Sequence, residues 1–204
     1  LVEQREHTRY PVFEEDLDGL PHVMFGKQPG LLGADFVQPR AARRHDRRGT
    51  IPGRVSIEQR PATVEARTRV GHWEGDTIIG ARHRQAIISL VERKSRYTLL
   101  TKVERKTAHL VGQAVTGLLK PFKARVHSLT TDNGKEFAEH QTIARKLKAA
   151  FYFAHPYASW ERGTNENTNG LVRQYFFKKR RFDTIQPEET AFAMQRLNHR
   201  PRQC

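Results

Sequence analysis

The stretch HWEGDTIIGARHRQAIISLVERKSRYTLLTKV, residues 72–103, contains three apolar runs in succession. HWEGDTIIG, QAIISLVER and YTLLTKV each have the length of a strand and are rich in β-branched or aromatic side chains, and KSR separates the last two as a turn. Strands that follow one another directly along a chain usually pair antiparallel. These residues therefore predict a three-stranded antiparallel meander.

Helices and strands alternate after this meander, and crossover connections of that kind favour parallel pairing. We therefore predict an α/β fold, with a mixed five-stranded sheet flanked by helices. The expected later elements are a helix over 108–119 capped by Thr107, a strand over 124–131, a helix over 135–148, a strand over 149–155, the loop PYASWERG, and helices over about 164–177 and 187–197.

The composition indicates a polyanionic partner. The chain has 204 residues, a net charge of +14 and a pI of about 10.4, and a basic surface attracts phosphates by counterion release. The only cysteine is Cys204, so neither a disulfide framework nor a cysteine zinc site is expected. No apolar run has the length of a membrane span and no signal peptide is visible, so we expect a cytoplasmic protein without a membrane partner.

Charge is unevenly distributed along the chain. Residues 1–38 hold three basic and seven acidic side chains, show no sustained hydrophobic period and stay unassigned. Residues 39–70 are predicted to be a basic linker, because PRAARRHDRRGTIPGR (39–54) sets six arginines against one acid. This stretch is a solvated linker, a strap over nucleic-acid phosphates, or both. The arginines assigned to DNA contact are Arg43, Arg44, Arg47 and Arg48.

Three carboxylates stand out in the remaining core, residues 71–204. Asp76 lies among apolar neighbours in the first strand, where a carboxylate needs a salt bridge or a metal. Asp132 follows the fourth strand in TTDNGKEF, where it is either a turn residue or a catalytic group. Glu166 falls in the first turn of a helix, a position that also suits the helix dipole. Glu74, on the same strand face as Asp76, is interpreted as a bystander near the end of the strand.

The three acids form one site if the first and fourth strands are neighbours. The two aspartates would then lie side by side, and the Glu166 helix would cross the same edge. Three converging carboxylates repel one another unless cations separate them. Mg²⁺ suits such oxygen ligands, and two such ions can support an in-line phosphoryl displacement.

From about residue 47 onward, the sequence resembles the DDE transposases of the insertion-sequence-30 family. The matching stretches are DRRGTIPGRVSIEQRPATVEAR, GHWEGDTIIG, VERKSRY, TTDNGKEF, HPYASWERGTNENTNGLVRQYF and LNHRPRQC. The resemblance implies an RNase H-like integrase core in which Asp76, Asp132 and Glu166 are catalytic. It also implies two Mg²⁺ ions, replaceable by Mn²⁺, and DNA as the substrate of cleavage and strand transfer.

The resemblance carries further expectations about assembly. Transposition needs a multimer on paired DNA ends, so we expect a homo-oligomer on DNA, in the bacterial cytoplasm at the nucleoid. Such transposases begin with helix-turn-helix segments, and none is seen upstream of the core. Their sequences also continue past the position of Cys204, so the core is predicted to be truncated at its C-terminus.

Further DNA contacts are predicted around the helix that carries Glu166. In the preceding loop, Trp160 either packs on the core or, with Tyr157, stacks on unpaired DNA ends. A basic set on or after the helix is expected to line a DNA groove: Arg173, Lys178, Lys179, Arg180 and Arg181. Two other classes stay open, an RNase H-like nuclease that hydrolyses without joining strands and a truncated, non-catalytic nucleic-acid-binding remnant.

Overall fold

The structure is a computed structural model, and it describes residues 51–81 and 84–201. The unassigned segment 1–38 lies outside the described residues. So does the first part of the predicted basic linker, with Arg43, Arg44, Arg47 and Arg48.

The described chain forms a five-stranded sheet of order β3-β2-β1-β4-β5. The antiparallel meander is confirmed: β1 (His72–Ile79) pairs with β2 (Ala86–Glu92), and β2 pairs with β3 (Thr98–Val103). Strands β4 (Ser128–Thr131) and β5 (Ala150–Phe153) join in parallel, β4 alongside β1 and β5 alongside β4. The predicted mixed sheet is therefore confirmed, with β1 at its centre.

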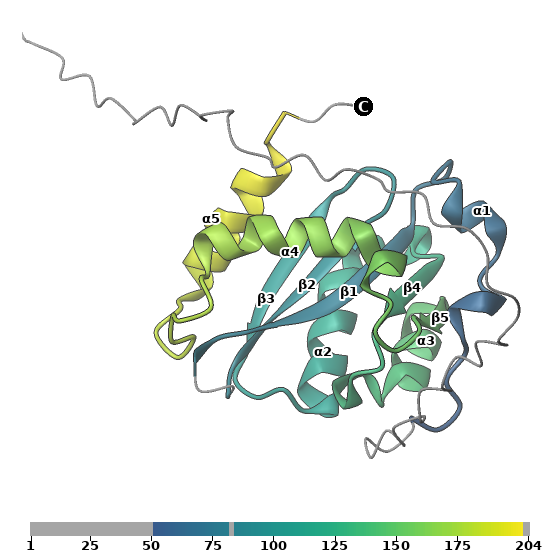
Figure 1. Ribbon diagram of the computed structural model, residues 1–204, viewed down its shortest axis with the longest axis horizontal. Coiled ribbons are helices and arrows are strands. Elements are labelled where there is room, and N and C mark those ends of the chain that lie inside the picture. Colours follow the sequence, from purple (N-terminus) through teal and green to yellow (C-terminus); the bar gives the residue numbers. More distant parts are fainter. Residues whose placement is uncertain (1–50, 82–83, 202–204) are drawn as a thin grey trace, which may run out of the picture. The chain divides into compact units, whose positions relative to one another are not determined.

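Helices cover both faces of the sheet (Figure 1). On one face, α2 (Ala108–Leu119) and α3 (His140–Leu147) pack on a cluster that includes Ile88 and Leu90. On the other face, α4 (Gly163–Tyr175) and α5 (Pro187–Asn198) pack on a cluster that includes Ile87. Successive strand residues point to opposite faces, and helices cover both faces, so every residue of β2 is buried. This explains why β2 is mostly apolar.

The segment around Asp132 differs from the prediction in its boundaries. A 3-10 helix at Lys120–Arg125 replaces the start of the predicted strand, so β4 has only four residues. The predicted helix over 135–148 is divided into a 3-10 turn, Lys135–Phe137, and α3. A tertiary contact accompanies the break: the buried Glu136 carboxylate accepts a 2.8 Å hydrogen bond from Thr77 Oγ1 in β1.

Residues 51–70, the described part of the predicted linker, belong to the folded unit. They contain a 3-10 turn, Ile57–Gln59, and the short helix α1, Ala62–Glu65. Ile51 joins the core cluster, and Phe153 N of β5 donates a 2.9 Å hydrogen bond to Val55 O. This segment covers the outer edge of β5, which would otherwise present unpaired backbone groups.

No helix within residues 51–81 and 84–201 is both long enough and apolar enough to cross a membrane.

Replacing Leu90 with Ala tests the core. Its side chain is fully buried between β1 and α2 on one face of the sheet, so we expect a loss of about 2–5 kcal/mol in the free energy of unfolding. Val70→Ala is the control, because Val70 is 44% exposed and should cost less than about 0.5 kcal/mol. Chemical denaturation measures both, and equal losses would contradict the packing.

Candidate active site

The parallel pairing of β1 with β4 aligns the two aspartates. His72 pairs with Ser128 and Glu74 with Thr130, so the paired β1 residues lie opposite residues 56 positions later. The same offset brings Asp76, within β1, to Asp132, the first residue after β4. Burial and the negative charge of Asp76 raise the pKa of the Asp132 carboxyl group above its ordinary value. The two carboxylates therefore lie close enough to repel each other.

Two side chains of the loop and helix after β5 hold Asp76. Arg162 Nη1 lies 3.4 Å from Asp76 Oδ2 and donates to Gly75 O. Asn169 Nδ2 donates a 2.9 Å hydrogen bond to the same carboxylate oxygen. The positive charge of Arg162 also lowers the pKa of Asp132, against the larger effect of burial. The sequence did not single out Arg162 or Asn169; their signal was their spacing of four and three residues from Glu166.

Glu166 shares a stripe of side chains with residues that contact β1. Residues 162, 166, 169 and 173 share one stripe of a helix with about 3.6 residues per turn. Arg162 and Asn169 contact Asp76, and Arg173 Nη1 donates a 3.0 Å hydrogen bond to Ile79 O. The Glu166 side chain itself is exposed. Within the described part of the chain, no three His, Cys, Asp or Glu side chains are close enough together to hold a metal ion.

The Asp-Asn-Gly turn connects three segments. Asp132 Oδ1 accepts a 3.0 Å hydrogen bond from Gly134 N, the local bond expected of a turn aspartate. Asn133 Nδ2 donates to Ala154 O, at the end of β5. Asn133 Oδ1 accepts a 2.6 Å hydrogen bond from Arg54 Nη1, which reaches the turn from the segment before β1. The turn is thus fixed on both sides, and Asp132 with it.

Glu74 is the third residue of β1, but it is not the bystander that the sequence suggested, because its side chain is fully buried. Its Oε1 lies 3.3 Å from Arg93 Nη1, and its Oε2 accepts a 2.9 Å hydrogen bond from Asn165 N in α4. Burial raises the pKa of the Glu74 carboxyl group, and the charge of Arg93 opposes this shift. The apolar neighbours of Glu74 could have signalled its burial, but its partners are distant in sequence.

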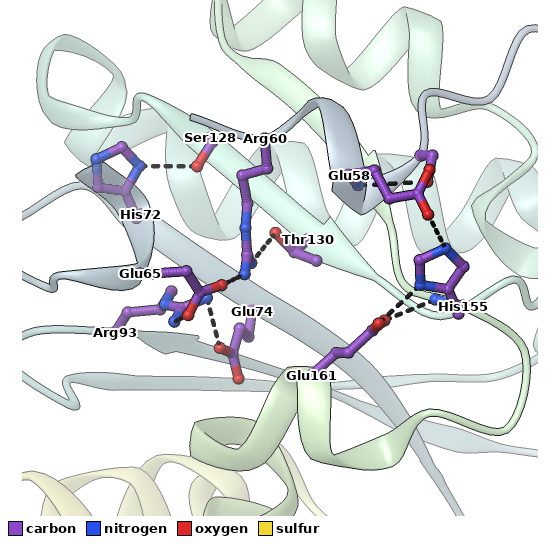
Figure 2. A network of polar contacts seen from close by, with 11 residues as sticks. Glu58, Arg60, Glu65, His72, Glu74, Arg93, Ser128, Thr130, His155 and Glu161 are labelled. Atoms are coloured by element: carbon purple, nitrogen blue, oxygen red, sulfur yellow. Dashed lines mark hydrogen bonds and ion pairs between the residues drawn. The ribbon is translucent and has the colours of Figure 1, made fainter. Parts of the chain in front are cut away.

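A second buried arginine extends this network (Figure 2). Arg60 Nη1 donates a 3.1 Å hydrogen bond to Thr130 Oγ1, and both Arg60 and Arg93 pair with Glu65 of α1. Burial lowers the pKa of the Arg60 guanidinium to about 10. Because two arginines face two glutamates, the layer beside Glu74 and Thr130 is electrically balanced, unlike the layer of Asp76 and Asp132.

The two predicted aromatic contacts point outward. The Tyr157 and Trp160 side chains are 82% and 74% exposed, so the alternative in which Trp160 packs on the core is wrong. The loop that carries them is held by His155, whose Nδ1 lies 2.7 Å from Glu161 Oε1 and whose Nε2 lies 3.2 Å from Glu58 (Figure 2). The hydrogen bond to Glu161 raises the pKa of His155.

The basic residues predicted to line a DNA groove fall into two groups, exposed lysines and arginines that contact other groups of the protein. Lys178 and Lys179 are exposed. Arg173 is half-buried against backbone carbonyls, Arg180 pairs with Glu189 at 2.6 Å, and Arg181 pairs with Asp183. Arg173, Arg180 and Arg181 therefore bind groups of the protein itself.

Comparisons with known proteins agree with this geometry. Residues 66–159 match the family model of the integrase core domain. The catalytic core domain of BIV integrase has a TM-score of 0.50 and 19% identity, over 65% of this chain and 86% of that one. The simian T-cell lymphotropic virus intasome in complex with a PP2A regulatory subunit also has a TM-score of 0.50, at 23% identity, over 64% of this chain and 49% of that one. Sheet order, flanking helices and family match define an integrase catalytic core.

More similar relatives narrow the family. The transposase of insertion sequence element IS4351 from Bacteroides fragilis is 46% identical over 76% of this chain and 48% of the relative. The transposase of IS1086 from Cupriavidus metallidurans is 44% identical over 77% of this chain and 47% of the relative. Transposase InsI of IS30A from Escherichia coli is 38% identical over 80% of this chain and 44% of the relative. The chain carries an integrase core domain, and its homologues are transposases of the insertion-sequence-30 family. It spans about half the length of the curated relatives it matches.

Removing the charge of Asp132 should stabilise the metal-free protein. Folding raises the pKa of the Asp132 carboxyl group, so its ionised form destabilises the folded protein. This destabilisation is absent below the ordinary pKa of the group and grows as the pH rises through the raised pKa. We therefore expect Asp132→Asn, which keeps an oxygen for Gly134 N, to melt above the wild type at pH 7 in EDTA. The difference in melting temperature between Asp132→Asn and the wild type should shrink as the pH is lowered toward 4.

Glu104→Gln is the control for this prediction, because Glu104 has an exposed side chain that pairs with Lys102. Its melting temperature should follow that of the wild type at both pH values. An Asp132→Asn protein that melts below the wild type at pH 7 would show that the aspartate is held by favourable contacts.

Proposed function

We propose that this chain is the catalytic core of a DNA transposase, which cleaves DNA strands and joins them to a target. The observation that carries the proposal is the alignment of Asp76 with Asp132 on adjacent parallel strands, in a chain 38–46% identical to insertion-sequence transposases. Catalytic groups commonly lie at the carboxyl ends of such strands.

Asp76, Asp132 and Glu166 are the residues that would hold two Mg²⁺ ions, or Mn²⁺ in their place. Integrase core domains use divalent metals, and the donor set fits them: two repelling carboxylates supply oxygen ligands. Beside them, Asn169 Oδ1 is buried and has no hydrogen-bond partner among the described residues. When bound, such ions activate an attacking oxygen and stabilise a leaving oxygen in an in-line phosphoryl displacement.

Two displacements of the same kind make up the reaction. In the first, a water oxygen bonds to a phosphorus at the end of the element while the bond to the 3′ oxygen breaks, which frees a 3′-OH. In the second, this 3′ oxygen bonds to a phosphorus of the target, whose own 3′ oxygen leaves. Asp76 lies in β1 and Asp132 directly follows β4, so both would be held by the sheet, whereas Glu166 would come from the first turn of α4.

DNA contacts would come from exposed groups around this site. Tyr157 and Trp160 project from the loop before α4 and would stack on unpaired bases. Lys178 and Lys179 would contact phosphates, as would the arginine strap of Arg43, Arg44, Arg47 and Arg48. The full transposase would act as a homo-oligomer on paired DNA ends, at the nucleoid in the bacterial cytoplasm.

Asp132→Asn should abolish strand transfer. Because the metal-bound carboxylates provide most of the charge stabilisation, we expect at least about a thousandfold loss of rate, with DNA binding retained. The assay joins a labelled, precut DNA end to a target in Mn²⁺, with Glu104→Gln as control. Wild-type rates in Asp132→Asn would refute the assignment. If the wild type hydrolyses DNA without joining strands, and Asp132→Asn abolishes that hydrolysis, the RNase H-like nuclease would be favoured instead. If the wild type binds DNA but catalyses no reaction, the non-catalytic remnant would be favoured.

The arginine strap should determine the salt dependence of DNA binding. Each phosphate contact adds about one unit to the slope of log affinity against log salt. Changing Arg43, Arg44, Arg47 and Arg48 together to Ala should therefore flatten the slope by up to about four units, without changing sequence preference. Titrations on inverted-repeat and scrambled duplexes measure both quantities.

Arg181→Ala is the matched control, since Arg181 already pairs with Asp183 and should change the slope by less than about one unit. A preference of about a thousandfold for the repeat would reveal a recognition module that the sequence did not show.

A further inference from the structure

Helix α4 begins against a buried carboxylate of the central strand. Its N-cap residue, Arg162, makes no side-chain cap hydrogen bond, although the first N–H groups of a helix need acceptors. Asn165 N, in the first turn, instead donates a 2.9 Å hydrogen bond to Glu74 Oε2. The cap is thus supplied from β1, by a residue far from α4 in sequence.

We propose that Glu74 is a positioning residue, whose carboxylate ties the first turn of α4 to β1 and so holds Glu166 toward Asp76 and Asp132. This inference rests on the proposed function, in which Glu166 is the third acid of the site. The connection is short at both ends: Glu74 precedes Asp76 by two residues in β1, and Asn165 immediately precedes Glu166 in α4.

A charged residue at this place is suited to the task. A carboxylate near the N-terminus of a helix interacts favourably with the helix dipole, and a charge-assisted hydrogen bond is stronger than a neutral one. Burial would make the charge costly if it were unpaired. Arg93, itself 3% exposed, balances it at 3.3 Å.

The charges that balance Glu74 extend to α1 and β4 (Figure 2). Arg93 follows β2 and also pairs with Glu65 of α1 at 2.9 Å. Glu65 in turn pairs with Arg60, which donates to Thr130 of β4. Thr130 lies directly opposite Glu74 and two residues before Asp132. The network therefore links the strands that carry both aspartates to the helix that carries Glu166.

The same contacts separate Glu74 from the acids that would bind metal. Oε1 faces Arg93 and Oε2 accepts from Asn165 N, so both of its oxygens face protein groups. Its side chain is fully buried, whereas Glu166 is exposed and Asp76 and Asp132 are half-buried. Glu74 thus acts through the backbone of α4 and not on the reacting atoms.

Two variants test the proposal in the full chain. Glu74→Gln keeps an acceptor for Asn165 N but removes the charge. The double variant Glu74→Leu with Arg93→Met removes the acceptor and both buried charges, a replacement that buried ion pairs often tolerate without loss of stability. Glu92→Gln is the matched control: Glu92 is also a buried strand carboxylate, but it accepts from Gly71, Lys94 and Ser95, away from α4.

Amide hydrogen exchange at Asn165 and Glu166 measures how firmly Glu74 anchors the first turn of α4. Calorimetry measures the Mn²⁺ affinity of the proposed metal site. Glu74→Gln should speed exchange and weaken Mn²⁺ binding by about two- to tenfold, the range for weakening one hydrogen bond. The double variant should speed amide exchange and weaken Mn²⁺ binding, each by at least about tenfold. Glu92→Gln should leave both at wild-type values, even if its melting temperature falls.

Wild-type exchange and Mn²⁺ affinity in Glu74→Gln would overturn the proposal, whether or not the double variant folds. Faster exchange with unchanged Mn²⁺ affinity would also overturn it, because Glu74 would then only stabilise the helix. If the wild-type chain binds no Mn²⁺, the two-metal function fails, and unchanged exchange in Glu74→Gln would separately refute the anchor.

Discussion

The parallel pairing of β1 with β4 is the constraint on which the rest of the structure depends. It sets Glu74 opposite Thr130 and brings Asp76 to Asp132, so two layers of polar side chains lie one above the other at the centre of the sheet. The pairing is possible because α2 carries the chain across one face of the sheet from β3 to β4. Central strands buried by helices on both faces hold their register firmly, since a slip of one residue would turn every side chain to the opposite face.

The two polar layers differ in how their charge is balanced, and this difference separates structure from chemistry. Beside Glu74 and Thr130, two buried arginines form ion pairs with two glutamates. At Asp76 and Asp132, Arg162 is the cation whose charge reaches both carboxylates, and the pKa of Asp132 stays raised. Buried polar groups that are paired rigidify a fold, whereas two neighbouring carboxylates with less compensation repel each other, which agrees with the cation site that we propose there.

The loop and helix after β5 bring the remaining groups to this edge. The loop holds its aromatic side chains in solvent through the contacts of His155 with Glu58 and Glu161. Helix α4, which carries Glu166, is attached to β1 at three levels, through Asn165, Asn169 and Arg173. In the proposed site, two acids at neighbouring strands would be combined with a third near a helix end, where fraying is easiest.

Much of this was determined by the sequence alone. Apolar runs of strand length, cap and turn residues, and the positions of Asp76 and Asp132 at strands predicted the mixed sheet and the aspartate pair, because these features depend on local periodicity. Tertiary structure alone decided the partners of charged side chains. A run of basic residues does not show which of its cations form an ion pair with an acid of the same chain, as Arg180 does with Glu189. A glutamate two residues from a candidate ligand likewise does not disclose that an arginine from the next strand balances it. Ion pairs form between residues that folding brings together across long sequence separations, so only the folded chain showed that Glu74 is paired with an arginine, whereas burial and a neighbouring acid raise the pKa of Asp132.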